Sequence, residues 1–383
     1  MAELLYLDTA RLGQMSPTAA KMYADFGRLA VEVPTGPCTE NFLFHGTAAA
    51  PEIASQYPEL ARWTGIDGLK LQLKTAFASN ASADSQVLLA NRTTELMEFG
   101  VRSVLDRCDR VLLTDLTWPP YLLWMLEHFG RSGIDVSFVP LKRAVWKEGR
   151  SAADLTEIIL SHLRTNNCDG LFLPAVTHTG IKLPIETILN ELHYQSAQTA
   201  TVIDASQAFG HVDTNAWTHL ADFIVGGMHK WVRAYLPLAV GFLQNPRTKI
   251  NRDQLSAFEP GDRNETMNLA PFLTTCGALS DLSEQNADRH DDYSELVSTR
   301  LTDWEHWKRL NLDSSLQCRI TLARPEKREN HQIIRQRLAD TNIAATVFHD
   351  GTTRFSISQG GFIQFATALH HLQTVSTLTA TAR

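Results

Sequence analysis

The sequence predicts an α/β protein with a mostly parallel seven-stranded sheet flanked by helices, followed by a smaller C-terminal α+β domain. Seven short apolar runs recur along the chain with helical patterns between them, and this alternation ends at about residue 250. The runs are rich in Val, Leu, Ile and Phe and mostly do not alternate with polar residues, which is typical of strands covered on both faces. Strands that alternate with helices indicate βαβ units. The expected strands are residues 85–90, 110–115, 135–140, 170–176, 200–205, 222–227 and 238–244.

The elements between and after these strands follow from capping and periodicity signals. Ser151 is a candidate N-cap for a helix over residues 151–166, with Asp154 three residues further on. We expect a connector at 245–254, helices at 268–285 and 288–311, a strand at 317–323, a helix at 326–340, strands at 343–349 and 352–358, and a final helix at 361–378. The expected divisions are an N-terminal segment (1–20), a large domain (21–250) and a small C-terminal domain (251–383).

Composition limits the classes of function that the chain can have. The 383 residues are enough for a large domain and a smaller one, and 44% hydrophobic with 20% charged residues is ordinary globular composition. A net charge of −7 without a run of Lys or Arg argues against a nucleic-acid partner. Residues 1–10 do not resemble a signal peptide, and no apolar run reaches the ~18 residues of a membrane span.

The cysteines also indicate where the protein works. They are scattered and odd in number, without a CxxC pair or a zinc-like spacing, so no metal site is expected. This usage fits a reducing compartment, and we expect a cytoplasmic protein without a membrane partner. The five are Cys38, Cys108, Cys168, Cys276 and Cys318.

Polar residues follow five of the expected strands directly. Ligands of open parallel sheets bind at the carboxyl ends of the strands, so these residues are candidates for a site. Each has a simple structural explanation when taken alone, as a helix cap, a turn residue, a core aromatic or a surface charge. Together they indicate the chemistry of pyridoxal phosphate (PLP). They are Asn91 to Glu95, Asp115 with Trp118, Thr177 with His178, Asp204 with Gln207, and His229 with Lys230.

Two segments also carry a resemblance to a known family. "VIDASQAFGHVD" (202–213), followed by "DFIVGGMHKW" (222–231), resembles the class V aminotransferase superfamily. This group of PLP-dependent enzymes of fold type I includes cysteine desulfurases, kynureninase and isopenicillin-epimerase-like enzymes. Further matches occur in the same order along the chain at "YLDTARLGQMSP" (6–17), "NRTTE" (91–95), "PAVTHTGIKLPI" (174–185) and "RFSIS" (354–358). The resemblance implies the PLP fold type I, a small amino-acid substrate and a homodimer.

The resemblance implies a role for each residue that contacts the cofactor ring. Lys230 would form the Schiff base with PLP and then carry the proton at the substrate Cα. Asp204 would pair with the pyridinium nitrogen and keep the ring protonated. Gln207 would bind the ring phenolate oxygen, with Thr177 close by. Trp118 is the candidate for stacking on the ring face.

It also implies how the phosphate and the substrate are held. Thr93 and Thr94, with the backbone N–H groups at the start of their helix, would bind the phosphate. His229 is the expected second phosphate partner. Arg354 would take the substrate carboxylate in a two-pronged pair.

The sequence departs from the desulfurase pattern at several positions. No cysteine follows Cys318, which predicts that the persulfide desulfurase mechanism is excluded. Gly227 stands where desulfurases often have a phosphate-binding serine, and residues 259–264 and 358–362 also depart from the family pattern. We therefore expect a PLP enzyme that acts through an external aldimine and Cα deprotonation, leading to transamination or β-elimination. An epimerase or cyclase of the isopenicillin-epimerase-like type, and a non-catalytic PLP-fold protein, are the alternatives.

Overall fold

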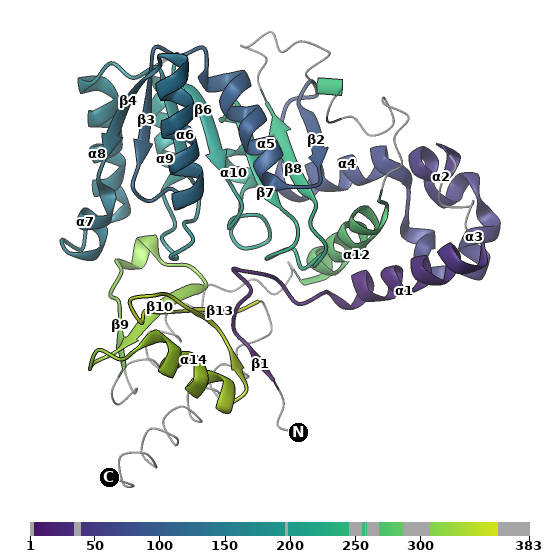
Figure 1. The fold of residues 1–383 in the computed structure, drawn as a ribbon. Helices are drawn as coiled ribbons and strands as arrows, with labels where there is room; N and C mark the ends of the chain where they lie inside the picture. Colours follow the sequence, from purple (N-terminus) through teal and green to yellow (C-terminus); the bar gives the residue numbers. More distant parts are fainter. Residues whose placement is uncertain are drawn as a thin grey trace, which may run out of the picture.

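A computed structural model of the chain describes residues 4–33, 40–195, 198–244, 255–256, 258, 268–285 and 307–358. Its largest part is a seven-stranded sheet with helices on both faces, and a smaller antiparallel sheet lies beside one edge of it (Figure 1). This arrangement confirms the predicted fold class. Within the described residues, no helix has the length and apolar character needed to cross a membrane.

All seven predicted strands form the large sheet. The order across it is β2-β8-β7-β6-β5-β3-β4, in which β8 runs antiparallel to both of its neighbours and the other pairs are parallel. The bounds are β2 Gln86–Ala90, β3 Arg110–Thr114, β4 Asp135–Val139, β5 Gly170–Pro174, β6 Ala200–Asp204, β7 Phe223–Gly227 and β8 Ala239–Leu243.

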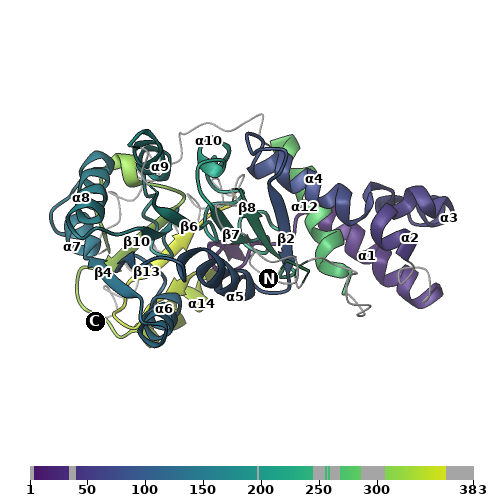
Figure 2. The same cartoon turned by 90° about the horizontal axis from the view of Figure 1, so that it is seen from above.

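Helices cover both faces of this sheet. Figure 2 shows α5 and α6 on one side, and α4, α8, α9 and α10 on the other. Alternate residues of one strand reach opposite cores: Val202 packs with α5 and α6, whereas Ile203 packs with the opposite layer. Both positions must therefore be apolar, which explains why the strands read as uninterrupted apolar runs.

The helices in the described residues range from the single turn of α10 to the 16 residues of α1. They are α1 Pro17–Glu32, α2 Glu40–His45, α3 Pro51–Gln56, α4 Gly65–Phe77, α5 Thr93–Gly100, α6 Pro119–Ser132, α7 Leu141–Trp146, α8 Ala152–Thr165, α9 Ile185–Tyr194, α10 Asn215–Thr218, α12 Ala270–Gln285 and α14 His331–Asp340. Short 3₁₀ turns span Gly46–Ala49, Pro58–Arg62 and Ser314–Leu316, and a π-helical turn spans Val101–Leu105. The capping box predicted at Ser151 is present, because its side chain accepts from the Asp154 N–H and its own N–H donates to the Asp154 carboxylate.

The smaller sheet has the order β12-β13-β10-β9 and is antiparallel throughout. Its strands are β9 Trp307–Arg309, β10 Ile320–Pro325, β12 Thr346–Val347 and β13 Thr353–Ser356. The helix predicted over 326–340 begins only at His331, because Asn330 caps it by accepting from the Gln332 N–H at 2.8 Å. The helix predicted over 288–311 is wrong at its end, where residues 307–309 pair with β10. The predicted final helix, 361–378, and the connector at 245–254 lie outside the described residues.

The N-terminal segment connects the small sheet to the large one. Strand β1 (Leu5–Tyr6) pairs in parallel with β11 (Ile343–Ala344), and Asp8 forms a bridge with Ser356 of β13. The chain then crosses to the loop after β7, where the Gly13 N–H donates to the His229 carbonyl at 2.8 Å. The Ser16 N–H donates to the Arg233 carbonyl at 3.0 Å before α1 begins. Residues 5–16 therefore contact both the small sheet and the loop that carries Lys230.

Gly13 allows this close contact because it has no side chain. A Cβ at this position would lie 1.9 Å from the backbone oxygen of Lys230, a separation that only backbone movement could relieve. We expect Gly13→Ala to reduce the free energy of unfolding by about 2–4 kcal/mol, measured by chemical denaturation.

Gly27→Ala is the matched control for this substitution. Gly27 lies on α1 with no atom within 4 Å of an added Cβ, so alanine should raise the free energy of unfolding by about 0.5–1 kcal/mol. Equal free energies of unfolding of the two variants would mean that the N-terminal segment does not pack on the loop that carries Lys230.

Candidate functional site

The polar residues predicted at the strand ends meet at one edge of the large sheet. Strands β5, β6 and β7 are neighbours and parallel, and Pro174, Asp204 and Val225 lie opposite one another in register. Thr177, Asp204 and Lys230 therefore leave the sheet at the same edge. Three separate chain segments bring together a hydroxyl, a carboxyl and an amine.

Lys230 is an amine in a largely desolvated position. Burial lowers its pKa to about 8, the nearby Asp204 carboxylate opposes this change, and the Arg354 guanidinium adds to it. A surface lysine has a pKa of about 10.4 and is almost entirely charged at neutral pH. Lys230 therefore has a much larger neutral, nucleophilic fraction under the same conditions.

Asp204, the last residue of β6, is the acidic partner of this amine. Burial raises the pKa of its carboxyl group, while hydrogen bonds from Ser206 and the charge of Lys230 lower it. The Ser206 N–H donates to the Asp204 Oδ1 at 2.8 Å and fixes the orientation of the carboxylate. A buried carboxylate is stabilised by a cation, so the site favours a positively charged group next to Asp204.

Gln207 lies in the turn that follows Asp204, and its amide is bonded at both ends within the protein. Its Nε2 donates to the Ala10 carbonyl at 2.7 Å, and its Oε1 accepts from the Trp231 indole at 2.7 Å. One N–H of the amide is left for the ring oxygen that the family resemblance assigns to it.

His229, Thr93 and Gly227 form a tight polar group. A Cβ on Gly227 would lie 2.8 Å from Cε1 of His229, 2.9 Å from its Nδ1 and 2.9 Å from Oγ1 of Thr93. His229 Nδ1 is buried without a hydrogen-bond partner among the described residues, and burial lowers the pKa of this imidazole to about 4. A serine at 227 would have to displace these two side chains.

Thr93 and Thr94 open helix α5. Arg92 occupies the N-cap position without a capping hydrogen bond from its side chain, so the first N–H groups of the helix remain available to an anion. Thr93 faces His229 and Gly227, whereas the Thr94 hydroxyl hydrogen-bonds the phenol of Tyr121. Both predicted threonines are therefore close to other groups of the site.

Trp118 is placed differently from its neighbour Tyr121. The Trp118 side chain is 43% exposed and meets the Tyr121 ring edge-on, with centroids 4.9 Å apart. Tyr121 is buried, and burial and the nearby charge of Asp204 raise the pKa of its phenol. The sequence pattern missed Tyr121, although it follows Trp118 by three residues, a spacing that places both on one side of the helix start.

Thr177 and His178 occupy the turn after β5. The Thr177 hydroxyl accepts from the Ile181 N–H at 3.0 Å and lies 3.0 Å from the Thr179 hydroxyl, so it stabilises the turn. Burial lowers the pKa of His178 to about 4, and Arg354, Lys142 and Lys230 contribute in the same direction. His178 is therefore neutral at physiological pH.

Arg354 on β13 reaches this site from the small sheet, but both terminal nitrogens of its guanidinium group already donate hydrogen bonds within the protein. One terminal nitrogen donates to Asp8 Oδ1 and to the Thr346 hydroxyl, both at 3.1 Å, and the other donates to the His178 carbonyl at 3.2 Å. A substrate carboxylate would have to compete with Asp8 to form a bidentate ion pair with the Arg354 guanidinium. Asp8 belongs to the N-terminal motif at residues 6–17, but nothing near it in the chain indicated that Arg354 would be its partner.

Buried polar atoms without partners concentrate in this region. In the described part of the chain, the atoms of this kind at the site are His178 Nδ1, His229 Nδ1 and Arg354 Nε. Each costs about 1–3 kcal/mol when left unsatisfied, so their concentration indicates a ligand with several polar groups. The described residues contain no group of three His, Cys, Asp or Glu that could hold a metal ion. This set of donors and acceptors fits an anionic aromatic cofactor such as PLP.

Comparison with known proteins places this geometry. No protein-family model and no curated protein matches the sequence. Solved structures do match: a cysteine desulfurase from Escherichia coli at 15% identity and a TM-score of 0.70, covering 97% of this chain and 95% of that one. An alanine–glyoxylate aminotransferase from Nostoc sp. matches at 15% identity and a TM-score of 0.70, covering 97% and 96%. The chain has the fold of the PLP-dependent class V aminotransferases. The family resemblance read from the sequence is confirmed at the level of the fold.

A third match corrects the predicted reaction. A cystine C–S lyase, solved with its reaction product cysteine persulfide, matches at 18% identity and a TM-score of 0.68, covering 97% of both chains. A cysteine desulfurase and this lyase stand among the matched structures, so the predicted exclusion of desulfurase chemistry was wrong. That exclusion rested on the absence of cysteine after Cys318. Such an absence concerns one possible sulfur acceptor and leaves the carbon–sulfur bond cleavage undecided.

The close packing of His229 and Thr93 around Gly227 provides a direct test of where the PLP phosphate binds. Gly227→Ala forces His229 and Thr93 to move while leaving their chemistry intact, so the affinity for PLP should fall by about tenfold or more. Gly130→Ala on α6, where an added Cβ meets nothing within 4 Å, is the control and should bind PLP normally. Unchanged PLP affinity of Gly227→Ala in an equilibrium titration would place the phosphate elsewhere.

Proposed function

We propose that this protein is a PLP-dependent enzyme that breaks the carbon–sulfur bond of a cysteine-type amino acid. The observation that carries the proposal is the Lys230 amine, whose pKa burial lowers to about 8, beside the buried Asp204 at the end of the neighbouring strand. The desulfurase and the C–S lyase that share this fold support the choice of substrate class.

The residues of the site divide between holding PLP and acting on the substrate. Asp204 would hold the ring nitrogen, Gln207 the ring oxygen, and Thr93, Thr94 and His229 the phosphate. When bound, PLP supplies an aldehyde for Lys230 and a ring that withdraws electrons from the substrate Cα. Trp118 and Tyr121 border the same space from the start of α6.

Lys230 would perform the proton transfers. Its lowered pKa lets the free amine accept a proton from the substrate Cα near neutral pH and return it later. His178 is neutral and cannot neutralise a carboxylate, so Arg354 remains the cation for the substrate carboxyl group. Asp8 holds Arg354 in place and limits how strongly it can bind that group.

Two broader expectations belong to this proposal. The scattered cysteines, of which the four described ones are free thiols, support a reducing cytoplasmic location. The class V resemblance supports a homodimer. Light scattering of the purified protein measures the second point, and a monomer at micromolar concentration would contradict it.

Lys230→Ala tests the function directly. The wild type reconstituted with PLP should show a visible absorption band, and borohydride should fix the cofactor covalently to the peptide that contains Lys230. The variant should lose both signals and release no sulfur from cysteine or cystine. The assay follows sulfur as protein-bound persulfide and as released persulfide or sulfide.

The control is Lys21→Ala, a lysine on α1 whose side chain is 65% exposed in an ion pair with Glu59. It should retain the band, the covalent product and the sulfur release. A reducible chromophore in Lys230→Ala would show that another amine binds the cofactor. A wild type that binds PLP but cleaves neither substrate would contradict the proposed reaction alone.

A further inference from the structure

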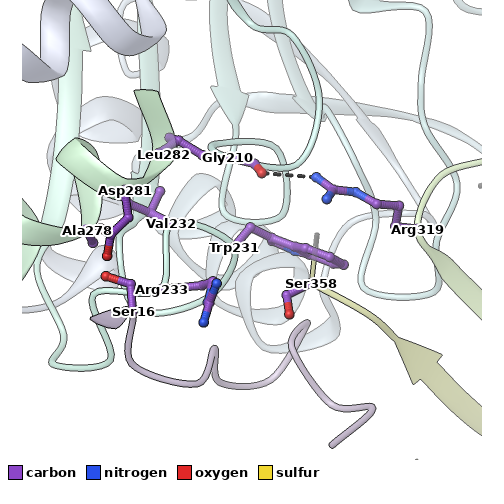
Figure 3. Close-up of a pocket in the computed structure, with 10 residues that line it drawn as sticks. All are labelled: Ser16, Gly210, Trp231, Val232, Arg233, Ala278, Asp281, Leu282, Arg319 and Ser358. Carbon is purple, nitrogen blue, oxygen red and sulfur yellow. Dashed lines mark hydrogen bonds between the residues drawn. The ribbon is translucent and has the colours of Figure 1, made fainter. Parts of the chain in front are cut away.

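The residue after the reactive lysine, Trp231, lies in a buried stack. Its side chain is 3% exposed, and the His211 ring packs parallel to it with centroids 3.7 Å apart and planes 16° apart. The Arg319 guanidinium lies 5.3 Å from the centre of the same indole. Figure 3 shows Arg319 above the Trp231 ring, with its hydrogen bond to the Gly210 carbonyl. The indole is therefore held in one position.

The indole N–H fixes the direction of the Gln207 amide. An indole nitrogen can only donate and a backbone carbonyl can only accept, so the amide oxygen must face Trp231 and the amide nitrogen must face Ala10. Both bonds measure 2.7 Å, and exchanging the two ends of the amide would place like groups together at each contact. The free hydrogen-bonding group of this side chain is therefore an N–H.

His211 also holds Gln207 in place, through a hydrogen bond to the Gln207 backbone. Its Nε2 accepts from the Arg319 backbone N–H at 3.0 Å, so the proton of the neutral ring sits on Nδ1. That N–H donates to the Gln207 carbonyl at 2.8 Å. Burial and the Arg319 charge lower the pKa of His211 well below its usual value, which keeps this arrangement neutral.

We infer that Trp231 is a positioning residue that holds the Gln207 amide so that it presents an N–H, and not a carbonyl, to the ring oxygen of the cofactor. The inference rests on the proposed function, in which Lys230 binds PLP beside Asp204. It also links the two loops of the site, because Gln207 follows the acid by three residues and Trp231 follows the amine directly. With PLP bound, this N–H would withdraw charge from the ring oxygen. It would thereby lower the pKa of the nitrogen that links Lys230 to the cofactor.

Trp231→Phe tests the inference, because it keeps an aromatic ring in the stack and removes only the N–H donor. The amide of Gln207 then keeps only its bond to the Ala10 carbonyl and is held less firmly, so the pH midpoint of the visible absorption band should rise. The expected rise is about 0.4–1 pH unit, equivalent to one hydrogen bond of about 0.5–1.5 kcal/mol. Trp217→Phe, at a buried tryptophan of α10, is the control and should leave the midpoint unchanged.

The same substitution in a Gln207→Ala background separates positioning from general loosening of the site. If Trp231 acts through Gln207, then Trp231→Phe adds no further shift once the amide is gone. An equal shift in both backgrounds, or no shift in the single variant, overturns the inference. Thermal unfolding of each protein without PLP reports any loss of fold.

A second variant keeps the test valid if Trp231→Phe does not fold. Gln207→Glu retains the acceptor for the indole but replaces the remaining N–H donor with a carboxylate oxygen, so the midpoint should rise further. A midpoint equal to that of the wild type would overturn the inference. Absence of the visible band in the wild type would instead contradict the proposed function.

Discussion

The burial of the Lys230 amine beside Asp204 is the interaction on which the site depends. Removing either charge alone from water would be unfavourable, and the two groups compensate each other because parallel pairing of β6 and β7 places their ends side by side. Burial still dominates for the lysine and lowers its pKa to about 8, which leaves a neutral fraction for chemistry. The sheet therefore sets the reactivity of the amine by placing it where water is scarce.

The surrounding contacts keep these two groups in position. The N-terminal segment packs on the lysine loop at Gly13, where a side chain cannot fit, and continues to Asp8, which holds Arg354. The Gln207 amide joins the same segment to Trp231 through two hydrogen bonds. The N-terminal segment therefore contacts both Arg354 of the small sheet and the loop that carries Lys230.

Much of the fold and part of the site could be predicted from the sequence. The seven strands were visible because both of their faces are buried, and the rule of strand ends located Asp204 and Lys230. The partner of Arg354 could not be predicted, since Asp8 lies 346 positions away and meets it only where the N-terminal segment packs beside β13. Tyr121 was missed because its contact with Thr94 joins two helix starts that come together in space. The prediction that excluded the desulfurase reaction was wrong for a different reason, because one missing residue type does not determine which bond a cofactor breaks.

The central claim is that burial lowers the pKa of Lys230 while Asp204 opposes that decrease. Its most direct measurement is the pH dependence of reductive labelling of Lys230 by a small aldehyde in the protein without PLP, read by peptide mapping. Only the neutral amine reacts, so labelling should rise with pH through a midpoint of about 8. In Asp204→Asn the opposing charge is gone, and the midpoint should move lower. A wild-type midpoint near the ~10.4 of an exposed lysine, or a higher midpoint in Asp204→Asn, would contradict the account.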